Sequence, residues 1–301
     1  MSTIRQIAVI AVALFGCPIL VAAQEPEFLE SLLADVVRME AKPNNERGEV
    51  LQSVLTEYGI PFELETFEIR SRPDYPRTTG TNIVVTIGNG DRDIVIGGHY
   101  DAAPLGNGEF SPGATDNAAS AVILTRLAVA LVESDRDARI RIVMYDMEEI
   151  GLLGSANFIR QSRRRISAAI NLDINGYGDT LFYFLPEGPA GTGALFDAMT
   201  AICSGTEFRC KGTPAYPASD HLTFANARIP STSLAILPAA DVDALIAMAD
   251  PARQARPRGA PPSILRVIHT ANDTSRLVDP EAMWQTYRAV LALVEELSPA
   301  R

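Results

Sequence analysis

The chain has only three histidines, and two of them follow short apolar runs. Residues 93–98 lead into His99, and residues 264–268, which have the pattern of a strand, lead into His269. A single histidine after an apolar run is more often a buried structural residue than a ligand. These two become informative because carboxylates occupy similar places elsewhere in the chain.

The carboxylates of Asp116, Glu149 and Asp173 lie next to apolar segments in the same way. An ionised carboxylate in such a place is costly unless a cation pairs with it, and few Lys or Arg residues occur in these segments. Imidazole and carboxylate ligands together suit zinc, and manganese or cobalt could replace it. Two histidines and three carboxylates can hold two metal ions if one carboxylate bridges them, which is a known arrangement for hydrolysis.

The elements that must position these residues are predicted by hydrophobic periodicity. Strand-like runs alternate with helix-like runs, which predicts an α/β fold with a largely parallel sheet covered on both faces. In open α/β sheets, ligands bind outside the carboxyl ends of the strands, so we expect His99, Glu149 and Asp173 to converge there. The predicted strands are residues 61–70, 82–88, 93–99, 139–145, 168–173, 181–185 and 231–237, and the predicted helices are residues 27–58, 118–132, 151–161 and 279–297.

The composition limits the classes of function. The chain has 301 residues, of which 47% are hydrophobic and 21% are charged, and this is typical of a globular protein that needs no disulfide framework to fold. The net charge of -11 argues against a nucleic-acid binder and against attachment to anionic membranes. No stable protein partner is implied.

The first 23 residues have the pattern of a secretory signal peptide. Arg5 precedes an apolar run over residues 7–22, and small residues at 21–23 offer a cleavage site before Gln24. The run is shorter than the ~20 residues that a membrane span needs. We therefore expect an exported protein, periplasmic or extracellular, with one domain over residues 24–301. Lipoprotein anchoring at Cys17 is the less favoured alternative.

Two further features accompany this expectation. Cys203 and Cys210, seven residues apart in an exported chain, predict a local disulfide, with two free thiols as the alternative. Residues 238–262 are rich in proline and interrupt the pattern of elements, so they form a candidate lid. The arginines of this segment could close over the site and bind a carboxylate group of a substrate; they are Arg253, Arg256 and Arg258.

Six motifs follow one another along the chain, and the ordered set is more specific than any one of them. They are Gly97-Gly98-His99-Tyr100-Asp101, Gly113-Ala114-Thr115-Asp116-Asn117, Glu148-Glu149-Ile150-Gly151-Leu152-Leu153-Gly154-Ser155, Asn171-Leu172-Asp173, Ser219-Asp220-His221, and His269-Thr270 followed by Asp273-Thr274. In this order they resemble the zinc exopeptidase family of the secreted bacterial leucyl aminopeptidases. Relatives of that family include glutamate carboxypeptidases and glutaminyl cyclases.

The resemblance implies a fold, a ligand set and an activity. The fold would be a three-layer α/β sandwich with a central mixed, mostly parallel sheet flanked by helices. His99 and Asp173 would bind one zinc ion, Glu149 and His269 would bind the other, and Asp116 would bridge them. The activity would be removal of N-terminal residues from peptides with a free N-terminus.

The resemblance also implies roles for residues beside the metals. Glu148 would be the general base, which takes a proton from the attacking water and returns it to the leaving amine. Asp101 would orient the imidazole of His99, and Tyr216 would stabilise the tetrahedral intermediate. Apart from the resemblance, we expect Asp220 and His221 either to anchor the substrate loop by hydrogen bonds or to touch the substrate, and Asp273 to be a structural residue that fixes the turn of His269.

Two other functions compete with this one. A carboxypeptidase or a glutaminyl cyclase could use the same scaffold, although the full ligand set with Glu148 and Glu149 favours peptide hydrolysis. A binding domain without catalysis would have lost ligands, and the sequence has them all.

Overall fold

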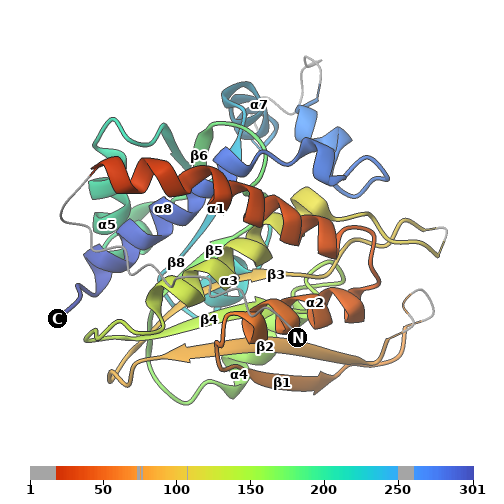
Figure 1. Ribbon diagram of the computed structural model, residues 1–301, viewed down its shortest axis with the longest axis horizontal. Helices are drawn as coiled ribbons and strands as arrows, with labels where there is room; N and C mark the ends of the chain where they lie inside the picture. The colour runs from red at the N-terminus through yellow and green to blue at the C-terminus, as the bar shows by residue number, and fades with distance from the viewer. Residues whose placement is uncertain (1–17, 73–74, 76, 107, 250–260) are drawn as a thin grey trace, which may run out of the picture.

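The computed structural model describes residues 18–72, 75, 77–106, 108–249 and 261–301, and for residues 18–25 and 249 only the course of the backbone. Its centre is an eight-stranded sheet with the strand order β1-β2-β4-β3-β5-β8-β6-β7 (Figure 1). Four neighbouring pairs are parallel and three are antiparallel, so the predicted mixed, mostly parallel sheet is confirmed. The strands are β1 (Glu63–Glu68), β2 (Thr79–Ile87), β3 (Asp93–His99), β4 (Arg139–Tyr145), β5 (Ile166–Leu172), β6 (Thr180–Phe184), β7 (Cys210–Thr213) and β8 (Ser231–Leu237).

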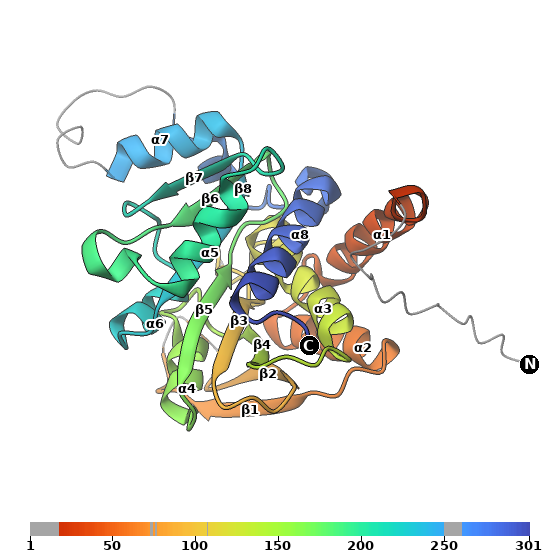
Figure 2. The ribbon, with the colours of Figure 1, turned by 90° about the vertical axis from the view of Figure 1, so that its left-hand side faces the viewer.

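Helices cover both faces of this sheet, which confirms the predicted three layers (Figure 2). On one face lie α1 (Pro18–Met39), α2 (Asn44–Glu57), α3 (Ala119–Leu131), α5 (Ala194–Cys203) and α8 (Pro280–Leu297). On the other face lie α4 (Leu153–Gln161), α6 (His221–Asn226) and α7 (Ala239–Ala249). The shorter helices are η1 (Ala114–Ala118), η2 (Gly188–Gly191), η3 (Ser263–Arg266) and η4 (Ser275–Leu277).

The strand residues explain why both faces must be covered. Successive side chains of a strand point to opposite faces, and every residue of β3 is buried. Ile94 and Ile96 belong to the large core under α1, α3 and α8, whereas Val95 belongs to the smaller core under α4 and α6. A continuous apolar strand of this kind is typical of a parallel sheet buried on both sides.

The predicted helical segment 27–58 consists of two helices, because the chain turns at residues 40–43. Pro43 precedes the first residue of α2, and a proline disfavours helical backbone angles at the residue before it, here Lys42. The side chains of Leu32, Val36 and Met39 anchor the second half of α1 in the large core. The two helices therefore form a hairpin that belongs to the body of the protein.

The strand predicted at residues 264–268 is wrong. Residues 263–266 form the 3-10 helix η3, and a turn follows it. The carboxylate of Asp241 on α7 accepts hydrogen bonds from the backbone N–H groups of Ser263 and Ile264, both at 2.8 Å. A short apolar run does not separate a strand from a helical turn, and this distant side chain decides between them.

The candidate lid is described in part. Its first half is the helix α7, which the sequence pattern did not predict, and this helix packs against β6. The second half, residues 250–260, lies outside the described residues, and so do Arg253, Arg256 and Arg258. The lid therefore stays a prediction.

At the N-terminus, α1 begins at Pro18 and runs through the predicted cleavage site before Gln24. Residues 1–17, with Cys17, lie outside the described residues, so export and lipid anchoring stay predictions. Among the described helices, none combines the length and the apolar character needed to cross a membrane. The predicted disulfide is confirmed: Cys203 and Cys210 are bonded, with 5.7 Å between their Cα atoms.

Candidate metal centre

The ends of three neighbouring strands bring the predicted ligands together. His99 is the last residue of β3, and β4 ends level with it because His99 pairs with Tyr145. Glu148 and Glu149 lie in the turn that follows β4, and Asp173 follows directly after β5. The convergence expected from the parallel sheet is confirmed.

The described residues form three groups that could hold a metal ion, and the two groups made only of predicted ligands share Asp116. In the first group, His99 Nε2 lies 3.2 Å from Asp116 Oδ1 and 3.6 Å from Asp173 Oδ1. In the second group, His269 Nε2 lies 3.1 Å from Asp116 Oδ2 and 3.1 Å from Glu149 Oε2. Each oxygen of Asp116 therefore faces a different histidine, which is the arrangement a bridging carboxylate requires.

The distances and the donor set fit zinc ions. Nitrogen and oxygen ligands lie about 2.0–2.2 Å from zinc, so two ligands of a tetrahedral ion are roughly 3.4 Å apart. The distances from each histidine to the two carboxylates of its group are close to this value. Glu149 Oε1 and Asp173 Oδ1 are also buried, and among the described residues neither has a hydrogen-bond partner. Such orphaned oxygens are expected where a cation binds.

The charges of the site lead to the same conclusion. Hydrogen bonds to Asp116 and Glu149 raise the pKa of His269 to about 11. Burial opposes protonation of His99, yet Glu148 and the carboxylates bonded to its ring raise its pKa well above the usual value. Burial, followed by the charge of Asp116, raises the pKa of Glu149 to about 7. The carboxylates thus favour positive charge in the site. Protons on the histidines supply this charge in the metal-free protein, and divalent cations can supply it instead.

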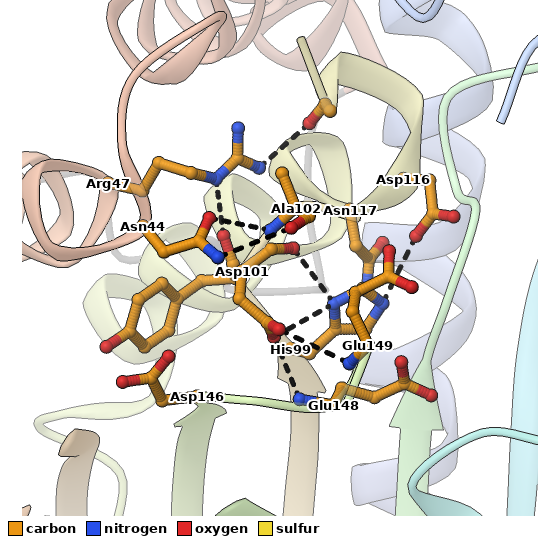
Figure 3. A network of polar contacts seen from close by, with 12 residues as sticks. Asn44, Arg47, His99, Asp101, Ala102, Asp116, Asn117, Asp146, Glu148 and Glu149 are labelled. Carbon is orange, nitrogen blue, oxygen red and sulfur yellow. Dashed lines mark hydrogen bonds and ion pairs between the residues drawn. The ribbon is translucent and has the colours of Figure 1, made fainter. Parts of the chain in front are cut away.

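Asp101 lies behind both the first histidine and the acidic turn (Figure 3). Its carboxylate oxygen Oδ1 is 3.5 Å from His99 Nδ1, and its carbonyl oxygen is 3.2 Å from the same nitrogen. Its two carboxylate oxygens also accept the backbone N–H groups of Glu148 and Glu149, at 3.0 and 3.2 Å. Asp101 therefore lies where it can orient His99 and the acidic pair at once, while Nε2 of His99 faces the ligand group.

Glu148 lies between the acidic turn and His99, and one of its oxygens is within 4.8 Å of the ligand atoms of His99 and Glu149. Burial is the main cause that raises its pKa well above the usual value, and the charges of Asp220, Asp173 and Glu149 raise it further. A carboxylate with a raised pKa is a stronger proton acceptor than an ordinary one. This is the property that the predicted base requires.

Tyr216, on the loop after β7, stacks on Phe182 of β6 with 4.7 Å between the ring centroids. Burial, followed by the charge of Asp173, raises the pKa of the Tyr216 hydroxyl, so this group is a neutral donor at working pH. The ring is thus fixed on the Asp173 side of the site. Its contribution to the intermediate stays a prediction.

Asp220 and His221 are fully buried at the start of α6. Burial raises the pKa of Asp220 to about 7 and lowers that of His221 to about 4, so both side chains favour the neutral form. The ring of His221 packs against Phe184, at 4.7 Å between centroids. Among the described residues, no side-chain oxygen or nitrogen of Asp220 and His221 has a hydrogen-bond partner, so the structure shows no anchoring of the loop by hydrogen bonds, and the role of the two residues stays a prediction.

Two residues of the motifs have positioning contacts that the sequence did not reveal. The carboxylate of Asp273 accepts the backbone N–H groups of Thr115 and Asp116, at 2.7 and 3.0 Å, so it holds the loop of the bridging ligand. The amide of Asn117 donates to the carbonyl oxygen of Leu172, at 2.9 Å, and accepts the N–H of Ile174, at 3.2 Å. Asn117 therefore holds the backbone on both sides of Asp173.

Two residues of α2, Asn44 and Arg47, also contact the ligand loops, and neither was predicted from the sequence. The sequence did contain one signal that pointed to Arg47. Arg47 lies four residues before Leu51 and eight before Leu55, so an arginine interrupts the apolar face of a helix.

Comparison with known proteins identifies the family of this site. A model of peptidase family M28 matches residues 82–294, which include every predicted metal ligand. The chain belongs to peptidase family M28. The family resemblance expected from the motifs is thereby confirmed, and so is the class of enzyme, a peptidase.

Curated relatives of this M28 chain carry aminopeptidase names. It is 25% identical over 221 residues to a probable leucine aminopeptidase of Arthroderma otae, which covers 70% of this chain and 56% of that protein. It is 35% identical over 89 residues to the aminopeptidase YwaD of Bacillus subtilis, which covers 28% of this chain and 18% of that one. The chain thus spans about half the length, or less, of these two curated relatives.

Solved structures share the fold of this M28 chain. A zinc aminopeptidase from Bacillus subtilis superposes with a TM-score of 0.57 at 22% identity, over 73% of this chain and 50% of that chain. The LapA aminopeptidase of Legionella pneumophila gives 0.64 at 18%, over 99% and 78%. The glutaminyl cyclase of Porphyromonas gingivalis gives 0.64 at 19%, over 91% and 98%.

Proposed function

We propose that this M28 peptidase is an exported aminopeptidase that removes N-terminal residues from peptides and uses two zinc ions. The observation that carries the proposal is the position of Asp116, whose two oxygens face His99 and His269 separately. One ion would be held by His99, Asp116 and Asp173, and the other by Asp116, Glu149 and His269. Manganese or cobalt could replace zinc with the same ligands.

The residues beside the ions supply the proton chemistry. Bound zinc lowers the pKa of water and polarises a carbonyl group. Glu148 accepts the proton of the attacking water and delivers it to the nitrogen of the leaving amine. Asp101 positions Glu148 and Glu149 through hydrogen bonds to their N–H groups, and His99 through a close contact with its ring. Tyr216 offers a neutral hydroxyl to the oxygen that gains negative charge.

The substrate class and the location have separate support. The aminopeptidase names of the relatives support peptide substrates with a free N-terminus. The apolar segment before Ala23 supports export to the periplasm or the outside. The disulfide between Cys203 and Cys210 agrees with an oxidising compartment.

The experiment that tests the activity is a product analysis by mass spectrometry. The zinc-loaded protein is incubated with a set of peptides, each with a free and with an acetylated N-terminus. Stepwise loss of residues from the free N-termini alone is the expected result. A matched incubation with the Glu148→Gln variant excludes a contaminating peptidase, because this variant keeps the size of the side chain and loses the base.

The competing functions give different products. A carboxypeptidase would shorten the C-termini of both peptide forms, and a glutaminyl cyclase would release ammonia from N-terminal glutamine without cutting the chain. Either result would contradict the proposed aminopeptidase. Absence of any product from the zinc-loaded protein would contradict the proposal as well and would favour a binding domain.

A further inference from the structure

A buried arginine lies directly behind the ligand loops. Arg47 of α2 has no exposed surface, and its guanidinium donates four hydrogen bonds. Every acceptor is a carbonyl oxygen of the main chain. The acceptors are those of Tyr100 at 2.5 Å, Gly113 at 2.8 Å, Pro112 at 3.1 Å and Met39 at 3.2 Å.

Two of these carbonyls, those of Tyr100 and Gly113, belong to segments that are far apart in the sequence but that each carry a predicted metal ligand. Tyr100 lies between His99 and Asp101, and Gly113 lies three residues before Asp116. One guanidinium therefore connects the loop of the first histidine to the loop of the bridging carboxylate. A planar group with several fixed donors is suited to this task, because its hydrogen bonds set a geometry.

Asn44, one turn before Arg47, adds a second connection. Its side-chain oxygen accepts the N–H of Ala102 at 2.9 Å, and its side-chain nitrogen donates to the carbonyl of Ala102 at 3.3 Å. The packing around Gly113 is tight as well: a Cβ there would lie 2.8 Å from that of Ala102 and 3.0 Å from Arg47 Nη1. The helix and both loops thus fit together without spare room.

Carboxylates beside the metal centre compensate the buried positive charge of Arg47. Burial of a cation is costly unless carboxylates compensate it. Burial lowers the pKa of Arg47, and the charges of Asp101 and Asp273 are the largest opposing causes. These two carboxylates hold the backbone of Glu148, Glu149 and Asp116 in place. Arg47 therefore supports the site through its charge and through its hydrogen bonds.

We propose that Arg47 is a positioning residue of the metal centre, which fixes the distance between His99 and Asp116. The α1–α2 hairpin, which precedes the part matched by the family model, would then be part of the scaffold of the site. The inference rests on the proposed function only in taking the clusters of histidines and carboxylates as metal sites. It is independent of which amide bond the enzyme cleaves.

The test compares Arg47→Lys with Arg126→Lys in the full chain. Arg126 is also buried, and it donates to Asp35 at 2.6 Å and to the carbonyl of Ser31 at 3.2 Å, so it ties α1 to α3 away from the ligands. Metal-free protein is titrated with zinc by calorimetry, and the absorption spectrum of the cobalt-loaded protein reports the ligand geometry. Circular dichroism and thermal unfolding monitor the fold of both variants.

We expect Arg47→Lys to weaken zinc binding roughly 10- to 100-fold, as other changes to groups behind metal ligands do, and to alter the cobalt spectrum. Arg126→Lys should lower the unfolding temperature but leave the zinc affinity and the cobalt spectrum unchanged. A folded Arg47→Lys variant with the affinity and spectrum of the wild type would overturn the proposal. An equal loss of affinity in Arg126→Lys would also overturn it, because general destabilisation would then be the cause.

If Arg47→Lys does not fold, Asn44→Ala decides. This variant removes both hydrogen bonds to Ala102, so it should weaken zinc binding, and unchanged binding would contradict the inference. The proposed function fails separately. A wild-type protein that binds zinc but cleaves no peptide would contradict the proposed aminopeptidase activity, and the zinc affinities of wild type and variants could still be compared.

Discussion

The two halves of the metal centre are built in different ways. His99 ends the buried strand β3 and Asp116 lies in the buried turn η1, with side chains that are 1% and 6% exposed. His269 lies on a turn, and its side chain is 56% exposed. Its backbone has a φ of 55°, which is uncommon for a residue with a side chain.

The difference shows two ways to hold a ligand. The register of the parallel strands and the core beneath them fix His99, so its position depends on much of the fold. A few hydrogen bonds fix the turn of His269: a local one from Thr270 Oγ1 to the carbonyl of Val267, at 2.7 Å, and a long-range one from Ser111 Oγ to the carbonyl of Thr270, at 3.0 Å. Changes in the first half should therefore affect folding and binding, and changes in the second half should affect binding alone.

The largest expected effect comes from the acidic turn of the buried half. Glu148→Gln should lower kcat by roughly 10²- to 10⁴-fold, because the variant has no base, and should keep both metal ions. Steady-state kinetics and elemental analysis of the same sample measure the two quantities. Activity close to that of the wild type would refute the assignment of the base.

Replacing each histidine separately tests the comparison itself. In the metal-free protein, His99→Ala should lower the free energy of unfolding by about 3–5 kcal/mol, because it leaves buried carboxylates without their partner. His269→Ala should lower the free energy of unfolding by less than about 1 kcal/mol, because water screens the ion pairs of the exposed His269 side chain. Both variants should lose zinc affinity. Urea denaturation gives the free energies, and equal losses would contradict the distinction between the two halves.

The disulfide provides a reference outside both halves. Replacing Cys203 and Cys210 by serine should lower the free energy of unfolding by about 2.5 kcal/mol, the chain-entropy value for a loop of this size. Zinc affinity should not change, since the bond joins α5 to β7 at one edge of the sheet. A marked loss of zinc affinity in this variant would mean that the edge of the sheet contributes to the site.

The smallest effect is a dependence on pH in the exposed half. The pKa of His269 is raised to about 11 in the folded, metal-free protein, so its protonated form stabilises the fold. This stabilisation is complete below the unfolded pKa, about 6.5, and decreases as the pH rises toward 11. The difference in unfolding free energy between wild type and His269→Ala should therefore shrink from pH 6.5 upward. A difference that stays constant or grows over this range would contradict the ion pairs of His269.

The sequence predicted the buried half well, for a physical reason. Residues 93–99 and 168–172 are buried strands, and their ends determine where His99 and Asp173 lie. Periodicity reports which residues are buried, and burial fixes these strands. The alternation of strands and helices was enough to predict that their carboxyl ends meet.

The exposed half and the supporting residues were harder to predict. The segment before His269 is a 3-10 helix because Asp241, more than twenty residues earlier, binds its first N–H groups. Arg47 and Asp273 act through contacts with distant backbone. Periodicity within a short window carries no information about such contacts. The motifs nevertheless located His269 and Asp273, since their order along the chain does not depend on local structure.

The metal centre is expected to hold two ions that share Asp116, and a crystal of the zinc-loaded protein, measured on both sides of the zinc absorption edge, would reveal them. We expect two anomalous peaks roughly 3.5–4 Å apart, one beside His99 and Asp173 and one beside His269 and Glu149. A single peak, or peaks that do not flank Asp116, would contradict this expectation.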